Sequence, residues 1–285
     1  MNPAKADPDA AYCLDQVRRF DRDRYLTALF AAAPARADLM ALYAFNLEVA
    51  KTRESVREPM MGLMRLQWWR DCISEIYAGG GRRHQVAQPL ADTIRRHGLD
   101  RALFDRLIDA READLSETPP DDLPALLAYV DATAGGLGLL AAQSLDAAAD
   151  RAAPAVRAVW IAWGIAGLLR AVPFHARHRR IHLPHALLAQ HGLDAHDVLE
   201  QRRAPALAQV VRAVASAACD HLASGRVLGP GLPRRLLPVM LLGAFAATDL
   251  RQLEAVGYDV YALRLQEAAP GRVWRLLWPS LRGRV

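Results

Sequence analysis

The stretch WIAWGIAGLLRAVPFHARHRRIHLP, residues 160–184, decides how the rest of the chain is interpreted. Its first part is apolar with small residues at helical spacing, which predicts a buried helix. Its second part, after Pro173, is strongly cationic and ends at Leu183–Pro184. Clustered guanidinium groups bind phosphate and carboxylate oxygens, so the basic part predicts either an anion pocket or a solvated turn. The cationic residues are Arg170, His175, Arg177, His178, Arg179 and Arg180.

The histidines of this region do not predict a metal site. His175, His178, His182 and His185 recur at spacings of three, four and three, as ligands on one helical face would. Prolines interrupt that face, however, no acidic residue lies among the histidines, and the neighbouring arginines would repel a cation. We therefore expect no metal ion here.

The composition predicts an all-α protein. The chain has 285 residues, of which 52% are hydrophobic, and no segment alternates as a strand would. Helical spacing recurs throughout, so we expect one domain of about a dozen helices around a central cavity. This domain is expected to span residues 11–266, after a disordered tail (1–10) and before a basic, Trp-containing tail (267–285).

The cysteine content and the net charge indicate in which cellular compartment the protein acts and which kinds of ligand or partner it binds. Cys13, Cys72 and Cys219 are isolated, which predicts no disulfide framework and a reducing compartment. No apolar run of about 18 residues and no leader-like N-terminus is recognised. We therefore expect a cytoplasmic protein, with contact to the inner membrane as an open alternative. The net charge of +5 suits a phosphate-bearing ligand, an anionic membrane surface or nucleic acid, and does not by itself choose among them. A nucleic-acid partner is not expected, because the basic patch is narrow.

The basic C-terminal segment RVWRLLWPSLRGRV, residues 272–285, has two structural interpretations, which the sequence supports equally. It is amphipathic and carries Trp274 and Trp278, so it predicts either a membrane-surface helix or a docked terminal helix.

Acidic residues on two earlier helices could serve a diphosphate-bound Mg²⁺ or only pair with neighbouring bases. In YAFNLEVAKTRES, residues 43–55, Glu48 and Glu54 share a broad helical sector with Lys51 and Arg53 between them. Carboxylates so placed can hold Mg²⁺ on a diphosphate, but the pattern favours ion pairs on a solvated face. In LIDAREADL, residues 107–115, Arg111 lies among Asp109, Glu112 and Asp114 and is expected to neutralise them.

Two further stretches have structural and functional interpretations. LQWWRDCISEIYAG, residues 66–79, places Gln67, Arg70 and Asp71 partly together beside two tryptophans that are expected in the core.

TAGGLG, residues 133–138, follows no strand and is not a dinucleotide fingerprint. Glycines in a helix permit close packing or a kink, and in a helical cavity they make room for a bulky apolar chain.

The order and spacing of these segments resemble the squalene/phytoene synthase family, whose members are all-α isoprenoid synthases that join two prenyl diphosphates head to head. The resemblance spans roughly residues 12–260 and implies an isoprenoid synthase-like helical bundle around a central cavity. In the N-terminal part it rests on DRDRYLTALF (21–30), on Arg36 seven residues before Tyr43, and on the Tyr43-Ala44-Phe45 stem. In the middle it rests on LQWWRDCISEIYAG followed by HQVAQPL, and on LIDAREADL followed by Tyr129 and Ala134-Gly135-Gly136. Further on it rests on the stretch from Gly164 through Leu168-Leu169-Arg170 to Arg180-Ile181-His182-Leu183-Pro184.

The chain departs from this family at the aspartates that hold Mg²⁺. The places of the first aspartate motif are occupied by Ala50, Lys51 and Glu54, and those of the second by Ala171 and His175. Ionising a prenyl diphosphate normally depends on metal bridges to the leaving group. The resemblance therefore implies that the metal clusters are absent, apart from Glu54.

These departures resemble a narrower group, the synthase-like assembly factors of respiratory complex I (assembly factor 6). The resemblance rests on residues 44–48 (AFNLE), 53–56 (RESV) and 169–175 (LRAVPFH). It implies a non-catalytic fold without cofactor, which binds an isoprenoid or lipid-like molecule or subunits of a respiratory complex. The alternative is an active prenyltransferase that uses Mg²⁺ with Glu48, Glu54, Asp71 and Asp114 as substitute ligands. An unrelated helical binding module is the third possibility.

No catalytic residue is assigned from the sequence. The residues expected to line the anion pocket or the cavity are Arg36, Tyr43, Glu48, Arg53, Glu54, Gln67, Arg70, Asp114, Arg170, His175 and Arg180.

Overall fold

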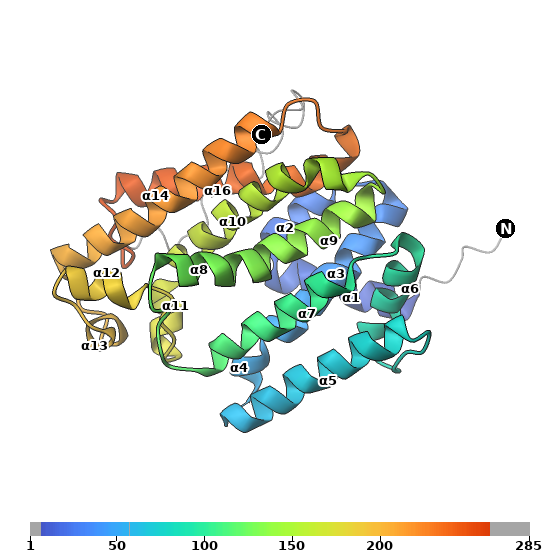
Figure 1. Ribbon diagram of the computed structural model, residues 1–285, viewed down its shortest axis with the longest axis horizontal. Coiled ribbons are helices and arrows are strands. Elements are labelled where there is room, and N and C mark those ends of the chain that lie inside the picture. Colours follow the sequence, from blue (N-terminus) through green and yellow to red (C-terminus); the bar gives the residue numbers. More distant parts are fainter. Residues whose placement is uncertain (1–6, 57, 263–285) are drawn as a thin grey trace.

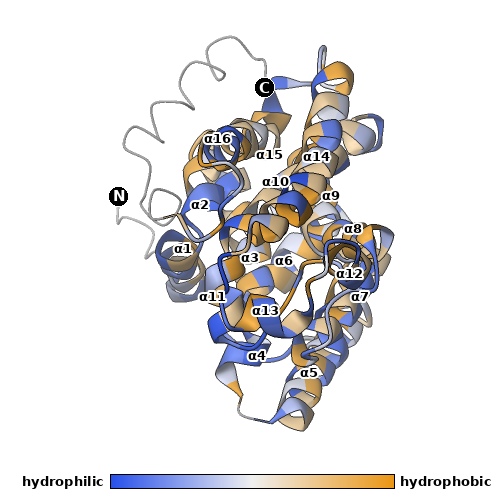
Figure 2. Cartoon of the chain, turned by 90° about the vertical axis from the view of Figure 1, so that its left-hand side faces the viewer, coloured by the Kyte–Doolittle hydropathy of each residue, from blue (hydrophilic) through white to orange (hydrophobic). Residues whose placement is uncertain are grey.

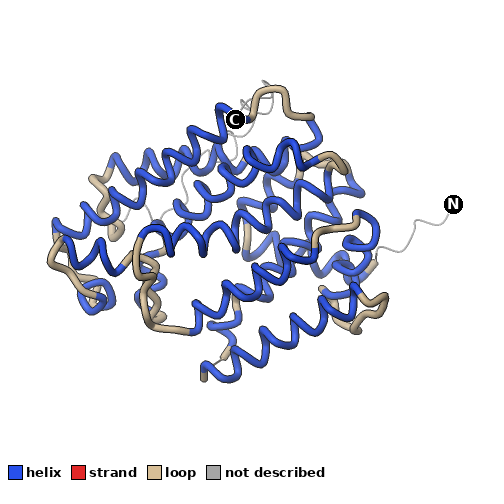
Figure 3. Tube along the Cα trace, in the orientation of Figure 1, coloured by secondary structure: helices blue, strands red, loops and turns tan. Residues whose placement is uncertain are grey.

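The computed structural model describes residues 7–56 and 58–262, and every regular element in these ranges is a helix (Figures 1 and 3). This confirms the predicted all-α fold. The first half contains α1 (Pro8–Phe20), α2 (Arg22–Ala28), α3 (Ala33–Ala50), α4 (Thr52–Ser55), α5 (Pro59–Tyr77), α6 (Ala87–His97), α7 (Arg101–Ala110), η1 (Arg111–Leu115), α8 (Leu123–Val130), η2 (Asp131–Gly135) and α9 (Gly136–Leu145). The second half contains η3 (Ala149–Ala152), α10 (Ala153–Arg170), α11 (Val172–Arg177), α12 (His185–Gln190), α13 (Ala195–Leu199), α14 (Pro205–Leu228), η4 (Arg234–Leu236), α15 (Leu237–Met240) and α16 (Leu242–Ala255).

Helices α3 and α10 form the interior of the bundle. Helix α10 packs against α9, α14 and α16, and α3 packs against α1, α6 and α9 (Figure 1). Every residue of α3 from Asp38 to Asn46 is buried, so this helix has no solvated face. A helix that is apolar almost all round belongs in a core. The apolar start of residues 160–184 is the second half of α10, as the sequence predicts.

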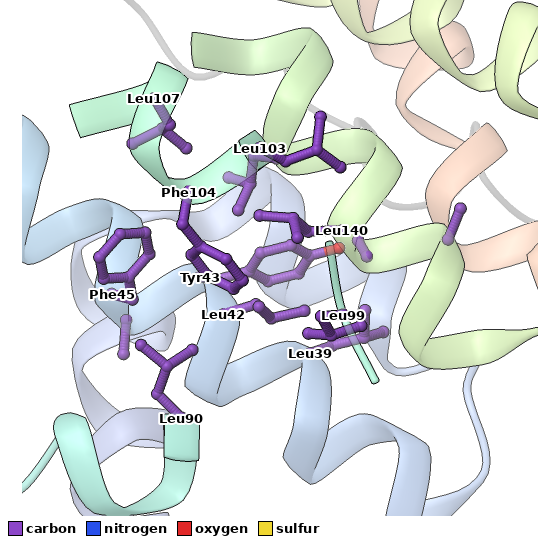
Figure 4. Packing of buried hydrophobic residues seen from close by; sticks show 14 of the residues in the cluster. Leu39, Leu42, Tyr43, Phe45, Leu90, Leu99, Leu103, Phe104, Leu107 and Leu140 are labelled. Atoms are coloured by element: carbon purple, nitrogen blue, oxygen red, sulfur yellow. The ribbon is translucent and has the colours of Figure 1, made fainter. Parts of the chain in front are cut away.

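Large side chains fill the middle of the bundle (Figure 4). Phe45 and Phe104 are fully buried, with ring centroids 5.4 Å apart in an edge-to-face arrangement. Tyr43 is also fully buried, 6.1 Å from the ring of Trp160. Aromatic pairs in such arrangements add to the apolar area that they bury. This part of the interior is therefore packed rather than hollow.

The glycine-rich step TAGGLG lets α9 approach α10. It begins in the π-helical turn η2, between α8 and α9. A Cβ atom at Gly138 would lie 2.4 Å from Cγ of Trp160, so only glycine leaves room for the indole. The Trp160 Nε1 donates a hydrogen bond of 2.9 Å to the carbonyl oxygen of Val239. The close-packing interpretation of these glycines agrees with this geometry.

Three helix boundaries differ from those expected. Helix α1 begins at Pro8, inside the expected tail, because proline suits a first helical turn and the Asp7 carboxylate caps the Asp9 amide at 3.0 Å. Helical spacing continues from Arg36 to Val56 and predicts one long helix, but the structure breaks it at Lys51, which separates α4 from α3. Residues 172–177 form α11, since Pro173 again lies in a first turn. The basic tail 267–285 lies outside the described residues.

Three helical stretches are long and apolar enough to cross a membrane by length and composition alone: Leu123–Leu145, Ala149–Arg170 and Arg234–Ala255. Charged and polar residues interrupt each of these stretches, so none of them is an uninterrupted apolar run in the sequence. In the structure 56%, 61% and 72% of their apolar windows are buried inside the bundle. Their apolar faces are thus used largely for helix packing.

Candidate functional site

A buried polar cluster lies where η1, α4, α8 and the basic segment after α11 meet. Backbone hydrogen bonds hold the segment in place: the amides of His185 and Ala186 donate to the carbonyl oxygens of Pro120 and Asp121 at 2.8 and 2.9 Å. The loop before α8 and the segment before α12 are thereby joined. The cluster consists of Asn46, Glu54, Arg111, Asp114, Tyr129, His175, Arg180 and His182.

Asp114 is the centre of the cluster and only 3% exposed. Its Oδ1 accepts a hydrogen bond of 2.8 Å from the Tyr129 hydroxyl and lies 2.9 Å from Nη2 of Arg180. Its Oδ2 lies 3.1 Å from Nη1 of Arg111. Burial alone would raise the pKa of Asp114, but the guanidinium groups of Arg111 and Arg180 outweigh burial and lower the pKa to about 2. The carboxylate is therefore ionised at neutral pH.

The two arginines tie three further elements to Asp114. Arg180 is 6% exposed, and its Nη1 lies 3.8 Å from Oε1 of Glu54 on α4. Arg111 donates to the Tyr129 hydroxyl at 2.8 Å and to Oδ1 of Asn46 at 3.4 Å. Two guanidinium groups thus face two carboxylates, so the formal charges in the cluster balance.

His175 and His182 form the uncharged side of the cluster. Their ring centroids are 4.6 Å apart, and the His182 ring stacks on Tyr129 at 5.5 Å. Burial, together with His182 and Arg180, lowers the pKa of His175 to about 2. Burial lowers the pKa of His182 to about 4, although Asp114 opposes the shift. Both imidazoles are therefore neutral at neutral pH.

A cavity of about 260 Å³ adjoins the cluster. Three polar atoms of the cluster, Nε of Arg111, Nε of Arg180 and Nδ1 of His175, are buried without a hydrogen-bond partner among the described residues, and Arg180 lines the cavity. A buried unpaired donor costs about 1–3 kcal/mol, so a polar ligand or water molecules would stabilise this region. The lining includes Ser116, Thr118, Pro119, Pro120, Tyr129, Arg180 and His182.

The cluster does not suit Mg²⁺. Magnesium prefers several oxygen ligands in octahedral geometry. Here the carboxylates of Asp114 and Glu54 already face guanidinium groups, and the other side chains of the cluster are uncharged. Among the residues that the structure describes, no group of three or more His, Cys, Asp or Glu is placed to hold a metal ion.

The structure therefore brings together four of the residues that the sequence singled out, namely Glu54, Asp114, His175 and Arg180. Arg53 lies half-buried on α4, next to Glu54. Tyr43 lies in the apolar core, and its buried hydroxyl has no partner among the described residues.

The other predicted site residues contact groups outside the cluster. Arg36 donates from Nη2 to the carbonyl oxygens of Leu29 and Ala31, at 3.2 and 3.0 Å, and thereby holds the turn after α2. Arg170 pairs with Asp249 at 2.8 Å, so it joins α10 to α16. The remaining pairs are Glu48 with Arg65 at 2.5 Å, Gln67 with Asp71 at 2.7 Å, and Arg70 with Asp109 at 2.7 Å and Glu112 at 2.5 Å.

Sequence reasoning did not list Asn46, Arg111, Tyr129 or His182 as site candidates. Asn46 had a usable signal, because it is a polar residue in the otherwise apolar stretch of α3. His182 stands out in the sequence for its spacing and Arg111 as a neutraliser of its neighbours, and both lie in stretches that resemble the family. The contact of Arg111 with Asp114 agrees with that role, but its contact with Tyr129 depends on tertiary structure.

The all-helical bundle has the fold of squalene and dehydrosqualene synthases. A squalene synthase from Alicyclobacillus acidocaldarius superposes with a TM-score of 0.78 at 22% identity, covering 88% of this chain and 94% of that one. A dehydrosqualene synthase superposes with a TM-score of 0.84 at 16% identity and covers 96% of both chains. The sequence profile described as squalene/phytoene synthase matches residues 17–282, so the chain belongs to that family.

Curated relatives include both assembly factors and enzymes. "NADH dehydrogenase (ubiquinone) complex I, assembly factor 6" of Bos taurus is 33% identical over 258 residues, covering 90% of this chain and 77% of the bovine protein. The protein of that name from Homo sapiens is 30% identical over 259 residues with the same coverage. A presqualene diphosphate synthase of Rhodopseudomonas palustris is 27% identical over 232 residues, covering 79% of this chain and 81% of the enzyme.

Proposed function

We propose that this protein is a non-catalytic member of the squalene/phytoene synthase family that assists the assembly of a membrane respiratory complex, and that its cavity binds an isoprenoid or lipid-like molecule. The mammalian relatives at about 30% identity, which are named for complex I assembly, carry the first part of the proposal. We further propose that the protein acts in the cytoplasm, at the surface of the inner membrane.

The polar cluster supports the absence of metal-dependent ionisation. The carboxylates of Asp114 and Glu54 are neutralised by guanidinium groups rather than by cations. His175 is buried and neutral, so it cannot replace an aspartate as an anionic ligand. Without a divalent cation to neutralise it, the diphosphate would be a poor leaving group.

An activity assay tests the proposal that the protein is not catalytic. Purified protein is incubated with farnesyl or geranylgeranyl diphosphate and Mg²⁺, and the release of pyrophosphate is measured. We expect none above a reaction without protein. Release that disappears in Glu54→Ala or Asp114→Ala would instead establish the alternative, an active prenyltransferase, which the presqualene diphosphate synthase relative supports.

Ligand binding is tested by thermal shift. Prenyl diphosphates should raise the melting temperature equally in Mg²⁺ and in EDTA, because the cluster offers guanidinium and hydroxyl donors rather than a metal. Stabilisation that requires Mg²⁺ would contradict metal-free binding.

The assembly role is tested in cells that lack the gene. We expect less assembled complex I on native gels and slower NADH oxidation by membranes, both restored by the wild-type chain. Normal complex I in the deletion strain would contradict the role. Because this experiment does not involve turnover, its outcome is separate from that of the pyrophosphate assay.

A further inference from the structure

The turn between α14 and α15 carries a cavity outside the polar cluster. Its volume is about 410 Å³, within the range of small-molecule sites. Six apolar side chains line it, those of Pro230, Leu232, Pro233, Leu236, Leu237 and Met240. The C-terminal end of α14 lies at the opposite end of the bundle from α11 (Figure 1).

Two arginines make this cavity attractive to an anion. Arg226 and Arg234 line it and are exposed, and neither has an ion-pair partner among the described residues. The described residues of the lining include no acidic side chain. Arg235, by contrast, is paired with Asp146 at 2.6 Å. An apolar pocket with two uncompensated guanidinium groups suits a ligand that has an apolar chain and an anionic head.

The surface beside the cavity is apolar and exposed. Val227 and Leu228, in the last turn of α14, are 78% and 49% exposed. In Figure 2 this end of α14 projects at the top of the molecule, where hydrophobic and hydrophilic residues adjoin. Aliphatic side chains next to arginines are the arrangement by which peripheral proteins enter an anionic membrane surface, because the chains reach the acyl region and the cations bind headgroup phosphates.

We propose that this cavity binds one acyl chain of an anionic bilayer lipid, that Arg226 and Arg234 hold the lipid phosphate, and that Val227 and Leu228 enter the bilayer. The end of α14 is then the part of the bundle that docks on the membrane. This proposal does not depend on the assembly role or on whether the protein has any catalytic activity.

Co-sedimentation of the full chain with vesicles tests the proposal. We expect binding to vesicles that contain phosphatidylglycerol and much weaker binding to phosphatidylcholine alone. Arg226→Gln combined with Arg234→Gln should lower the partition coefficient roughly 30-fold. The control, Arg22→Gln with Arg83→Gln, removes the same charge from two exposed arginines elsewhere and should change it little. Segment 263–285 is present in every variant, so its contribution is common to all.

A second variant separates the cavity from surface charge. Leu232→Trp fills the cavity while keeping both arginines, and it should also weaken vesicle binding. Unchanged melting temperatures would show that these variants are folded. The proposal is overturned if the two double variants bind vesicles equally well or if Leu232→Trp binds like the wild type. Stabilisation by free oleate without vesicle binding would equally overturn it, because the site would then take a soluble amphiphile.

Discussion

Asp114 holds the buried polar cluster together at the level of single residues. Its carboxylate contacts Arg111, Tyr129 and Arg180, which come from three separate parts of the chain. Without this carboxylate, both guanidinium groups would remain in the interior with much of their charge uncompensated. Breaking a buried ion pair by removing one partner costs far more than the pair itself contributes.

Asp114→Asn is therefore expected to destabilise the protein by about 3 kcal/mol, measured by urea unfolding. The matched control is Asp109→Asn, because Asp109 is exposed and its partner Arg70 also contacts Glu112. The control should cost less than about 1 kcal/mol. Equal losses in the two variants would show that the cluster is not a buried ionic network.

The partly buried His182 predicts loss of stability in mild acid. Its folded pKa of about 4 lies below the usual histidine value, so unfolding takes up a proton as the pH falls below about 6.5. Stability from this residue is complete above that pH and is lost as the pH approaches 4. At pH 5 the loss is about 2 kcal/mol.

Urea unfolding at pH 7.5 and pH 5 measures this effect. His182→Asn should show a smaller difference between the two pH values than the wild type, whereas His196→Asn, at an exposed position, should not. A pH dependence that is unchanged in His182→Asn would assign the acid sensitivity to other groups.

Arg180 shows what the sequence could not reveal about the site. Its place in a basic run predicts an anion pocket, but its charge faces Asp114 and Glu54, which come from η1 and α4. A run of basic residues shows how many charges are present, not which carboxylates the fold brings to them. The same holds for Arg170, whose partner Asp249 lies on α16. By contrast, comparing the sequence with the family's second motif is enough to see that Ala171 and His175 stand where the family has aspartates.

At the level of elements, the contact of α9 with α10 depends on one glycine. The nearest atoms to a Cβ at Gly138 belong to the ring of Trp160, which is fully buried and hydrogen-bonded to Val239. These are ring atoms next to the Cβ of Trp160 rather than the far end of a flexible side chain, so the indole cannot easily give way.

Gly138→Ala is accordingly expected to destabilise the protein by about 1–3 kcal/mol, because it overpacks this contact. The control is Gly167→Ala in α10, where a Cβ meets nothing within 4 Å and alanine favours the helix by up to about 1 kcal/mol. Thermal unfolding of both variants measures the effects. A Gly138→Ala variant as stable as Gly167→Ala would contradict the close contact.

The spacing of apolar residues predicts that these helices exist, but it does not predict where several of them begin and end. Apolar residues at helical intervals predict α3, α5, α10 and α14, because each must bury a face. The break at Lys51 has no proline or glycine to mark it. Pro173 predicts an irregular or kinked segment over 171–184, yet residues 172–177 form α11, because a first helical turn tolerates proline. The π-helical turn at 131–135 follows from packing rather than from local preference.

At the level of the whole molecule, two apolar clusters share one helix. One side of α10 contributes Val159 and Trp160 to the first cluster, and the following residues, Ile161 and Ala162, belong to the second. Trp163 packs against both. If α10 separated from either cluster, apolar side chains of the other cluster would therefore also become exposed to solvent.

We expect a single cooperative unfolding transition in urea for the full chain. Far-UV circular dichroism and tryptophan fluorescence should report the same midpoint, since the tryptophans of α10 lie at the junction of the clusters. Two separated midpoints would show that the clusters unfold independently.

The two backbone hydrogen bonds from His185 and Ala186 to Pro120 and Asp121 have a consequence for access to the cavity beside Asp114. Residues 116–121 and 180–182 line that cavity, and these bonds join the two walls. Moving one wall away from the other would break these bonds, so the cavity cannot widen between these two segments while both bonds are intact. The rates of hydrogen exchange of the two amides therefore report how often the two walls separate.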